Sequence, residues 1–311
     1  MNLKIILLTV VISATVTCYG QTVPIAPDIR KETFTFVKHD TSALKLDVYR
    51  HPSSPPNNPC IIFVFGGGFF TGSRDAEYYN GYFNTLVKNH YTVVSISYRL
   101  GLKGAKRLSK FNVAPLKNAI DMAVEDLFDA TKWVISNSEK IGIDPSKIIL
   151  SGSSAGAITV LQGDFEKRNN SKLAKNLPVD FQYAGVIAFA GAILSFDGNL
   201  KYQIPPAPTL MFHGTDDKLV YYNRIKLFNR SFNGSNYIAS VFKKNDYPYY
   251  FYRVERMGHE ISASPMRENT KDILWFIDEL VLQKKPYQVE ENFNDMKRKR
   301  AIILTSKDIY K

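Results

Sequence analysis

Two stretches near the start of the chain alternate between apolar and polar positions. They are Phe34 to Val37 and Leu44 to Tyr49, and the polar run His39 to Ser42 separates them. A period of two is typical of strands that bury one face. The pattern therefore predicts an antiparallel hairpin of two strands.

Further along, short runs of β-branched, aromatic and aliphatic residues recur without alternation, as expected for strands buried on both faces. These runs are Ile61–Phe65, Thr92–Tyr98, Ile148–Leu150, Val186–Phe189, Leu210–Phe212 and Tyr249–Val254. Segments with apolar residues at intervals of three and four separate most of them, and the clearest stripe runs from Leu116 to Val134. Another amphipathic helix is expected around Ile273 to Leu280, opened by Ser264-Pro265. Alternating strands and helices predict an α/β fold with a mostly parallel sheet and helices on both faces.

The first twenty residues have the composition of a secretory signal peptide. Lys4 precedes the apolar stretch Ile5 to Val16, and the small-residue exit Cys18-Tyr19-Gly20 follows. We expect cleavage before Gln21 and a secreted or periplasmic protein. Lipid attachment through Cys18 is the weaker alternative, because Thr15-Val16-Thr17 lacks the usual pattern before such a cysteine. No later stretch has the ~18 to 20 consecutive apolar residues that a membrane span requires.

The remaining chain has the length of one catalytic domain, which we place at residues 21–283, followed by a polar, basic tail at residues 284–311. After cleavage only Cys60 would remain, so an internal disulfide is excluded. The formal net charge of the full sequence is +11. Its one concentrated basic run, Lys297 to Arg300, lies in the polar tail without a nucleic-acid-binding framework, and we interpret it as solvated.

A glycine-flanked serine follows one of the apolar runs. Gly152-Ser153-Ser154-Ala155-Gly156 comes directly after Ile148 to Leu150 and before a helical pattern. This is the Gly-x-Ser-x-Gly nucleophile elbow, in which the serine occupies a strained turn between a strand and a helix. Glycines two residues away on either side let the neighbouring backbone pass without a Cβ clash. Ser154 is therefore the candidate nucleophile.

A serine hydroxyl needs an imidazole to accept its proton and a carboxylate to orient that imidazole. His259 follows the last apolar run, and the adjacent Asp216 and Asp217 follow Leu210 to Phe212. We favour Asp217 as the acid and keep Asp216 as an alternative. Either aspartate has a purely structural interpretation as the N-cap of a helix over Lys218 to Phe232.

Together these blocks resemble the α/β-hydrolase superfamily, in particular secreted carboxylesterases and hemicellulose esterases such as acetylxylan and feruloyl esterases. Phe65-Gly66-Gly67-Gly68-Phe69 is similar to the family's His-Gly-Gly-Gly-aromatic loop, with Phe65 in place of the histidine. The order Ser154, Asp217, His259 is also the family's. The resemblance implies an α/β-hydrolase fold, a catalytic triad of these three residues, and an oxyanion hole built from the N–H groups of Gly67, Gly68 and Ala155.

The resemblance also implies an ester substrate, either a short-chain or an aromatic carboxylic ester, with plant polysaccharide as one carrier. The interval between Ser154 and Asp217 leaves no room for a large lid, which favours accessible esters. Phe69 and Phe70, just after the glycine loop, are the candidate substrate contacts.

Two other functions compete with an esterase. A serine peptidase of the prolyl-oligopeptidase type uses the same triad, but fewer than 50 residues separate Gln21 from Gly66, too few for the propeller that commonly precedes it. A non-catalytic hydrolase-like binding protein usually has a damaged triad. We expect no cofactor and no metal, because the sequence has neither His-Glu-x-x-His nor a paired-cysteine site, and Gly66 to Gly68 is not a nucleotide fingerprint.

Overall fold

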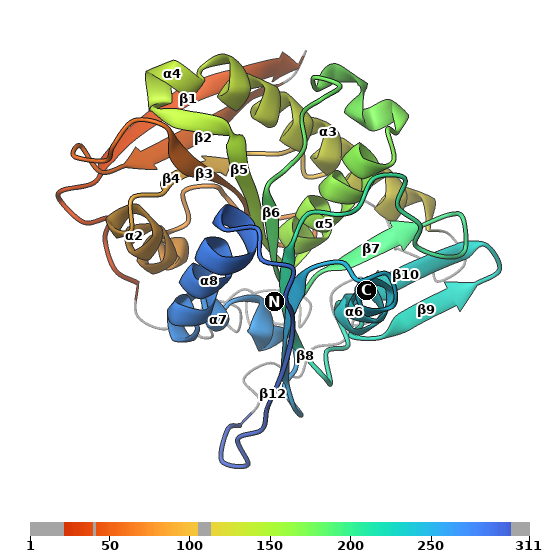
Figure 1. The fold of residues 1–311 in the computed structure, drawn as a ribbon. Helices are drawn as coiled ribbons and strands as arrows, with labels where there is room; N and C mark the ends of the chain where they lie inside the picture. Colours follow the sequence, from red (N-terminus) through yellow and green to blue (C-terminus); the bar gives the residue numbers. More distant parts are fainter. Residues whose placement is uncertain (1–21, 40–41, 105–112, 300–311) are drawn as a thin grey trace, which may run out of the picture.

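The computed structural model describes residues 22–39, 42–104 and 113–299. Its centre is a nine-stranded sheet with the order β1-β2-β4-β3-β5-β6-β8-β11-β12 (Figure 1). The strands of this sheet are β1 (Arg30–His39), β2 (Ser42–Arg50), β3 (Asn58–Val64), β4 (Thr92–Ile96), β5 (Ile143–Ser153), β6 (Gly185–Phe189), β8 (Thr209–Gly214), β11 (Tyr249–Val254) and β12 (Gln288–Phe293).

The predicted N-terminal hairpin is confirmed. Strands β1 and β2 pair antiparallel, with Phe34 opposite Leu46, and β2 then pairs antiparallel with β4. From β4 to β12 every neighbouring pair in this sheet is parallel. The six continuous apolar runs all lie on parallel strands, and the residues of β3, β4, β6 and β8 are almost entirely buried.

Helices cover both faces of the sheet, so its apolar strands are shielded from water on each side (Figure 1). The predicted stripe from Leu116 to Val134 lies on a single long helix, α3, which packs against α5. Helix α2 lies across the sheet from these two and contacts α7.

The α-helices are α2 (Asn80–Lys88), α3 (Ala114–Ser136), α4 (Ser138–Ile141), α5 (Ala155–Arg168), α6 (Ser235–Lys244), α7 (Pro265–Glu268) and α8 (Thr270–Phe276). Short 3₁₀ segments η1 (Glu77–Tyr79), η2 (Lys172–Asn176) and η3 (His259–Ser262) and the π-helical turn η4 (Ile277–Leu282) complete the described elements.

A second, three-stranded sheet was not expected from the sequence. It has the order β7-β10-β9, with β7 (Ala192–Ser195), β9 (Arg224–Leu227) and β10 (Arg230–Gly234). Both of its pairings are antiparallel. The helix considered for Lys218 to Phe232 is therefore wrong: polar and apolar residues alternate from Arg224 to Leu227, and this period of two favours a strand.

The main sheet also continues beyond residue 283, where we expected the catalytic domain to end. Strand β12 pairs with β11 from Gln288 to Phe293, although most of its side chains are exposed. Farther on, Arg298 donates a hydrogen bond to Ser264 Oγ and forms an ion pair with Glu268, so it folds back onto the main body. The sequence pattern did not predict this strand, because most of its residues are polar. An edge strand is held mainly by backbone hydrogen bonds to its one neighbour and does not require an apolar run. Within the described ranges, no helix is both long and apolar enough to cross a bilayer.

Candidate active site

Ser154 occupies a strained turn between β5 and α5. Its φ of 52° and ψ of −115° lie outside the conformations that residues other than glycine ordinarily adopt. The surrounding backbone is packed closely enough to hold it there. A Cβ atom at Gly156 would lie 2.0 Å from the carbonyl oxygen of Val64, and one at Gly152 would lie 2.3 Å from that of Gly156. The two glycines of the pentapeptide are therefore required by the approach of β3 and α5.

A chain of two short hydrogen bonds runs from this serine into the protein. Ser154 Oγ lies 2.7 Å from His259 Nε2, and His259 Nδ1 lies 2.7 Å from Asp217 Oδ2. Ser154 follows β5, Asp217 follows β8, and His259 follows β11, so three separate parallel strands deliver the three side chains to one edge of the sheet. Since a carboxylate only accepts, His259 donates through Nδ1 and leaves Nε2 to accept from the serine hydroxyl.

Asp217 is buried and accepts several hydrogen bonds. Its Oδ1 accepts from the backbone N–H groups of Leu219 (2.9 Å) and Val220 (3.1 Å). Its Oδ2 lies 3.4 Å from Nε2 of a second histidine, His213, as well as beside His259. Burial raises the pKa of Asp217, but the charges and hydrogen bonds of His259 and His213 outweigh that effect and hold its pKa well below the ordinary value.

The geometry distinguishes Asp216 from Asp217, which the sequence left as alternative candidates for the acid of the triad. Asp217 reaches His259, whereas Asp216 is only partly buried and its backbone N–H donates to the carbonyl oxygen of Met257. Asp216 thus fastens the loop after β8 to the loop that carries His259. Of the two carboxyl groups, only that of Asp217 is hydrogen-bonded to this imidazole among the described residues.

The glycine loop lies next to the serine. Gly67 and Gly68 have φ values of 128° and 64°, and a Cβ atom at the preceding Gly66 would lie 3.2 Å from Cβ of Ser154. Within the described part of the chain, no group accepts a hydrogen bond from the backbone N–H of Gly67, Gly68 or Ala155. The structure therefore brings three unused backbone donors into the neighbourhood of Ser154.

Tyrosine hydroxyls fix the shape of this loop. The N–H of Gly66 donates to the hydroxyl of Tyr79 (3.0 Å), and the hydroxyl of Tyr98 donates to the carbonyl oxygen of Phe65 (3.0 Å). The rings of Phe65 and Tyr98 also stack, with centroids 4.4 Å apart. A phenylalanine thus occupies the position of the family's histidine and is anchored by stacking.

A buried ion pair supports the loop from the other side. Asp126 on α3 accepts from the Arg99 side chain (Nε at 2.9 Å) and from the Arg99 backbone N–H (2.7 Å). Three residues later the Leu102 N–H donates to the carbonyl oxygen of Phe69. The ion pair between Arg99 and Asp126 therefore fixes the segment that holds the end of the glycine loop.

The two phenylalanines proposed to contact substrate differ in their surroundings. Phe69 is only 1% exposed, and its ring packs edge-on against Tyr98, so the structure corrects its assignment as a substrate contact to a core position. Phe70 is partly buried, and its ring covers Gly68: a Cβ atom at Gly68 would lie 2.5 Å from it. Only Phe70 therefore stays beside the expected reacting atoms.

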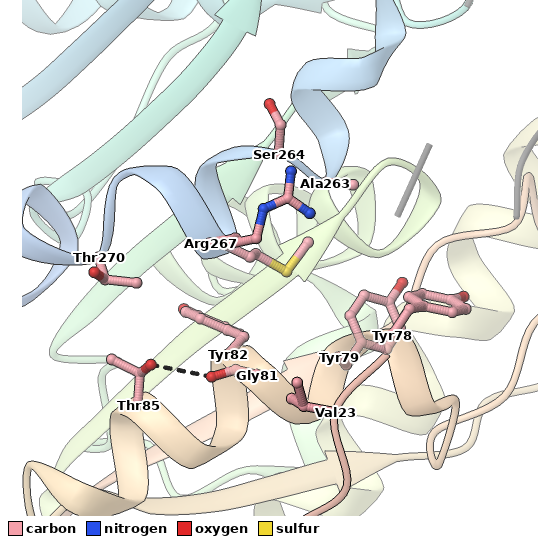
Figure 2. Close-up of a pocket in the computed structure, with 11 residues that line it drawn as sticks. Val23, Tyr78, Tyr79, Gly81, Tyr82, Thr85, Ala263, Ser264, Arg267 and Thr270 are labelled. Carbon is pink, nitrogen blue, oxygen red and sulfur yellow. Dashed lines mark hydrogen bonds between the residues drawn. The ribbon is translucent and has the colours of Figure 1, made fainter. Parts of the chain in front are cut away.

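A cavity of about 240 Å³ opens between α2 and α7. Tyr79, which binds the Gly66 N–H, forms part of its wall, and Ala263, just after η3, forms another part. Figure 2 shows the tyrosines of η1 and α2 on one side of this cavity and Arg267 of α7 on the other. The lining residues are Val23, Tyr78, Tyr79, Gly81, Tyr82, Thr85, Ala263, Ser264, Met266, Arg267 and Thr270.

Four supporting residues were not identified from the sequence: Tyr79, Tyr98, Asp126 and His213. Tyr79 and Tyr98 are indistinguishable from core aromatics until the loop that they bind is placed. The position of His213 could have been recognised in the sequence, because it directly follows a buried apolar run and lies four residues before Asp217. No group of three or more His, Cys, Asp or Glu side chains suited to a metal ion occurs within the described ranges.

Comparison with protein families gives a match over a central part of the chain. Residues 46–196 match the model of the family described as BD-FAE, a range that includes Ser154 and ends before Asp217. The para-nitrobenzyl esterase of Bacillus subtilis is 29% identical over 145 residues, which is 46% of this chain and 29% of that protein. The acetylcholinesterase of Gallus gallus is 34% identical over 117 residues, 38% of this chain and 15% of that protein. The matches thus span less than a third of the length of these two relatives.

Solved structures match much more of the chain. Esterase 2 of Thermogutta terrifontis phosphoramylated by tabun has a TM-score of 0.62 and 20% identity, and the match covers 83% of this chain and 96% of that one. The butyrate-bound form of the same esterase has a TM-score of 0.61 and 19% identity, covering 82% and 95%. At this level of identity the likeness establishes the fold alone, which is that of the α/β-hydrolases.

Proposed function

We propose that this chain, an α/β-hydrolase by fold, is a serine-dependent hydrolase of carboxylic esters. The observation that carries the proposal is the hydrogen-bonded series Ser154, His259, Asp217, with both donor–acceptor distances at 2.7 Å. The match to the BD-FAE family model and the partial matches to named esterases support the same reaction class.

In the proposed mechanism, Ser154 Oγ attacks the ester carbonyl carbon while His259 Nε2 takes the hydroxyl proton. Asp217 keeps the imidazole in the tautomer that accepts this proton and stabilises the imidazolium that forms. His259 then returns the proton to the leaving alcohol, which leaves an acyl group on Ser154. A water molecule, deprotonated by the same Nε2, hydrolyses this acyl-serine and regenerates the hydroxyl.

Negative charge develops on the carbonyl oxygen during both steps. The N–H groups of Gly67, Gly68 and Ala155 supply the proposed oxyanion hole, because they lie in the loop and helix start that flank Ser154. Removing one such donor typically costs about 3 kcal/mol of transition-state stabilisation. Two of these donors belong to a loop held by Tyr79, Tyr98 and Leu102, so the hole is organised before the substrate binds.

For the substrate we propose a short-chain or aromatic carboxylic ester, with plant polysaccharide as one carrier. None of Ser154, Asp217 and His259 lines the cavity between α2 and α7, so the proposed substrate class rests on the family match and on the Phe70 ring beside the glycine loop. We further propose that residues 1–20 direct the chain out of the cytoplasm, a segment that lies outside the described residues.

Active-site labelling tests the reaction. The purified protein would be treated with a fluorophosphonate and the adduct located by mass spectrometry, with Ser154→Ala as the matched variant. We expect one adduct on Ser154 and none in the variant. A panel of acetyl, butyryl, long-chain, feruloyl and peptide substrates would follow, with acetyl or butyryl esters hydrolysed faster than long-chain esters. Labelling elsewhere, or peptide cleavage faster than ester cleavage, would contradict the proposal.

A further inference from the structure

The β9–β10 hairpin projects apolar side chains into solvent. Its connection consists of Phe228 and Asn229, and Figure 1 shows it at the periphery of the molecule, away from the nine-stranded sheet. Phe228 is 85% exposed, Leu227 is 53% exposed and Ile225 is 44% exposed. We call these three residues the hairpin tip. Such a group of exposed apolar side chains at one protruding point is characteristic of a contact surface.

Several polar side chains of this small sheet are buried, while two of its apolar side chains are exposed. Cross-strand partners share a face, and Ser231, paired with both Ser195 and Lys226, lies on the face opposite to Ile225. Ser195 and Ser231 are buried, as is Asn233, whose side chain donates to the carbonyl oxygen of Ile193. Ile225 and Leu227 point the other way and are exposed. In this sheet Ser195, Ser231 and Asn233 are thus buried while Ile225 and Leu227 are exposed, which folding alone does not favour.

The charge of the hairpin itself is entirely positive, and one acidic residue, Asp197, lies beside it, next to Gly198, whose N–H donates to the carbonyl oxygen of Asn229. Residues 218–234 contain Lys218, Arg224, Lys226 and Arg230 and no acidic residue. Arg224 is occupied by Asn199 and the carbonyl oxygen of Gly198, whereas the other three basic residues are exposed. A second copy of a chain with a net charge of +11 would bring like charges together at this surface. The charge therefore favours an anionic partner over self-association.

From these observations we propose that the hairpin tip docks the protein on an anionic lipid surface. Three apolar side chains at a turn are suited to the boundary between headgroups and acyl chains, while the exposed Lys226 and Arg230 of the same hairpin are available to the lipid phosphates. Strand β9 begins at Arg224, a few residues after Asp217, so docking holds the loop with the buried carboxylate close to the lipid layer. The proposal concerns binding and is independent of the proposed ester hydrolysis.

Vesicle sedimentation tests this docking. The full-length mature protein would be mixed with vesicles of phosphatidylcholine alone or of phosphatidylcholine with phosphatidylglycerol, at low and high salt. The test variant is Leu227→Thr with Phe228→Asn: threonine favours the strand, and asparagine tolerates the φ of 53° at position 228. The matched control is Val179→Ser, since Val179 is 88% exposed and lies outside the hairpin.

We expect the protein and the Val179→Ser control to sediment with the anionic vesicles and much less with the neutral ones, and added salt to weaken binding. The tip variant should partition about tenfold less. Ser154→Ala should bind the anionic vesicles as the unsubstituted protein does. A failure of the proposed ester hydrolysis can therefore be distinguished from a failure of the proposed docking. Equal sedimentation of the tip variant, or no sedimentation with anionic vesicles, would overturn the proposal. So would a dimer in light scattering that the tip variant dissociates, because a second copy would then occupy the tip. Thermal unfolding of the tip variant would verify that it is folded.

Discussion

Nε2 of His213 lies 3.4 Å from Oδ2 of Asp217, in addition to the 2.7 Å contact between that oxygen and His259 Nδ1. The same Nε2 lies 2.9 Å from the carbonyl oxygen of Val220, which can only accept, so Nε2 of His213 carries a hydrogen. His213 therefore joins the start and the end of the loop that presents Asp217. It acts as a positioning residue, because Asp217 and His259 separate it from Ser154.

Replacing His213 should lower kcat without preventing folding. In His213→Gln the planar, aligned donor beside Asp217 is lost, and we expect kcat to fall about tenfold while KM changes little, because a positioning error acts mainly on the transition state. Steady-state kinetics on a butyryl ester would measure the effect. His90→Asn is the control, since His90 is exposed and asparagine tolerates its φ of 63°. An unchanged kcat in His213→Gln would refute this positioning role.

The two adjacent aspartates should differ strongly on substitution. Asp217→Asn replaces the acceptor for His259 Nδ1–H by an amide that permits the wrong tautomer, so kcat should drop by about 10⁴-fold. Asp216→Asn keeps the backbone bond to Met257 and should retain activity within a few-fold of the unsubstituted protein. The same ester assay on both variants measures this contrast. A larger loss in Asp216→Asn would reverse the assignment of the acid.

The hydroxyl of Tyr79 should matter for catalysis more than for stability. In Tyr79→Phe the Gly66 N–H loses its acceptor and the glycine loop is less firmly held. We expect kcat to fall roughly tenfold, a part of the loss seen when an oxyanion donor is removed altogether. Tyr221→Phe is the control, because Tyr221 is exposed and lies far along the chain. The readouts are kcat and the midpoint of thermal unfolding, and a lower midpoint with unchanged kcat would contradict the expectation.

Acid should reduce stability through Asp217. Its pKa in the folded protein is lower than the ordinary value near 3.9, so unfolding takes up a proton at low pH. The stabilisation from this carboxylate is fully present above about pH 4 and decreases as the pH falls below that value. Urea unfolding of the unsubstituted protein and of Asp217→Asn would be compared from pH 6 to pH 3. We expect the difference in their free energies of unfolding to shrink toward pH 3, and a constant difference would contradict this linkage.

Because the backbone is closely packed at the nucleophile elbow, replacing Gly156 by any larger residue should destabilise the protein. Gly156→Ala places a methyl group 2.0 Å from the carbonyl oxygen of Val64, so we expect a loss of at least ~2 kcal/mol of stability, from overpacking and backbone displacement. Gly81→Ala is the control: the nearest atom to its added Cβ lies 3.6 Å away, in the flexible side chain of Val23, and Gly81 is helical. Denaturant unfolding measures both. Equal stability of the two variants would show that the elbow relaxes more easily than its geometry implies.

The sequence predicted the main sheet and the three reacting groups because each has a local signature. Buried strands such as Ile61–Phe65 form continuous apolar runs, and Ser154 lies in a pentapeptide whose glycines have a steric cause. The acid required the structure, since Asp216 and Asp217 differ only in where the loop directs them.

The features that could not be predicted from the sequence depend on contacts between segments that are distant along the chain. Phe69 was a reasonable substrate contact until Tyr98 was found against its ring. The small sheet also escaped detection, because its buried face contains Ser231 and Asn233 while its exposed strand contains Ile225 and Leu227. Strand prediction from hydrophobic patterns takes the apolar positions as the buried ones, so it cannot identify strands in which polar residues are buried.

Strand β12 determines when the sheet can be completed. Its residues, Gln288 to Phe293, are synthesised after every other strand of the nine-stranded sheet, and they pair with β11, the strand that leads to His259. A nascent chain that ends before β12 has every other strand of the nine-stranded sheet, but β11 is then a sheet edge with unpaired N–H and C=O groups. Completion of this edge of the sheet therefore requires residues 288–293, and chains truncated near residue 283 would be exposed to edge-to-edge aggregation.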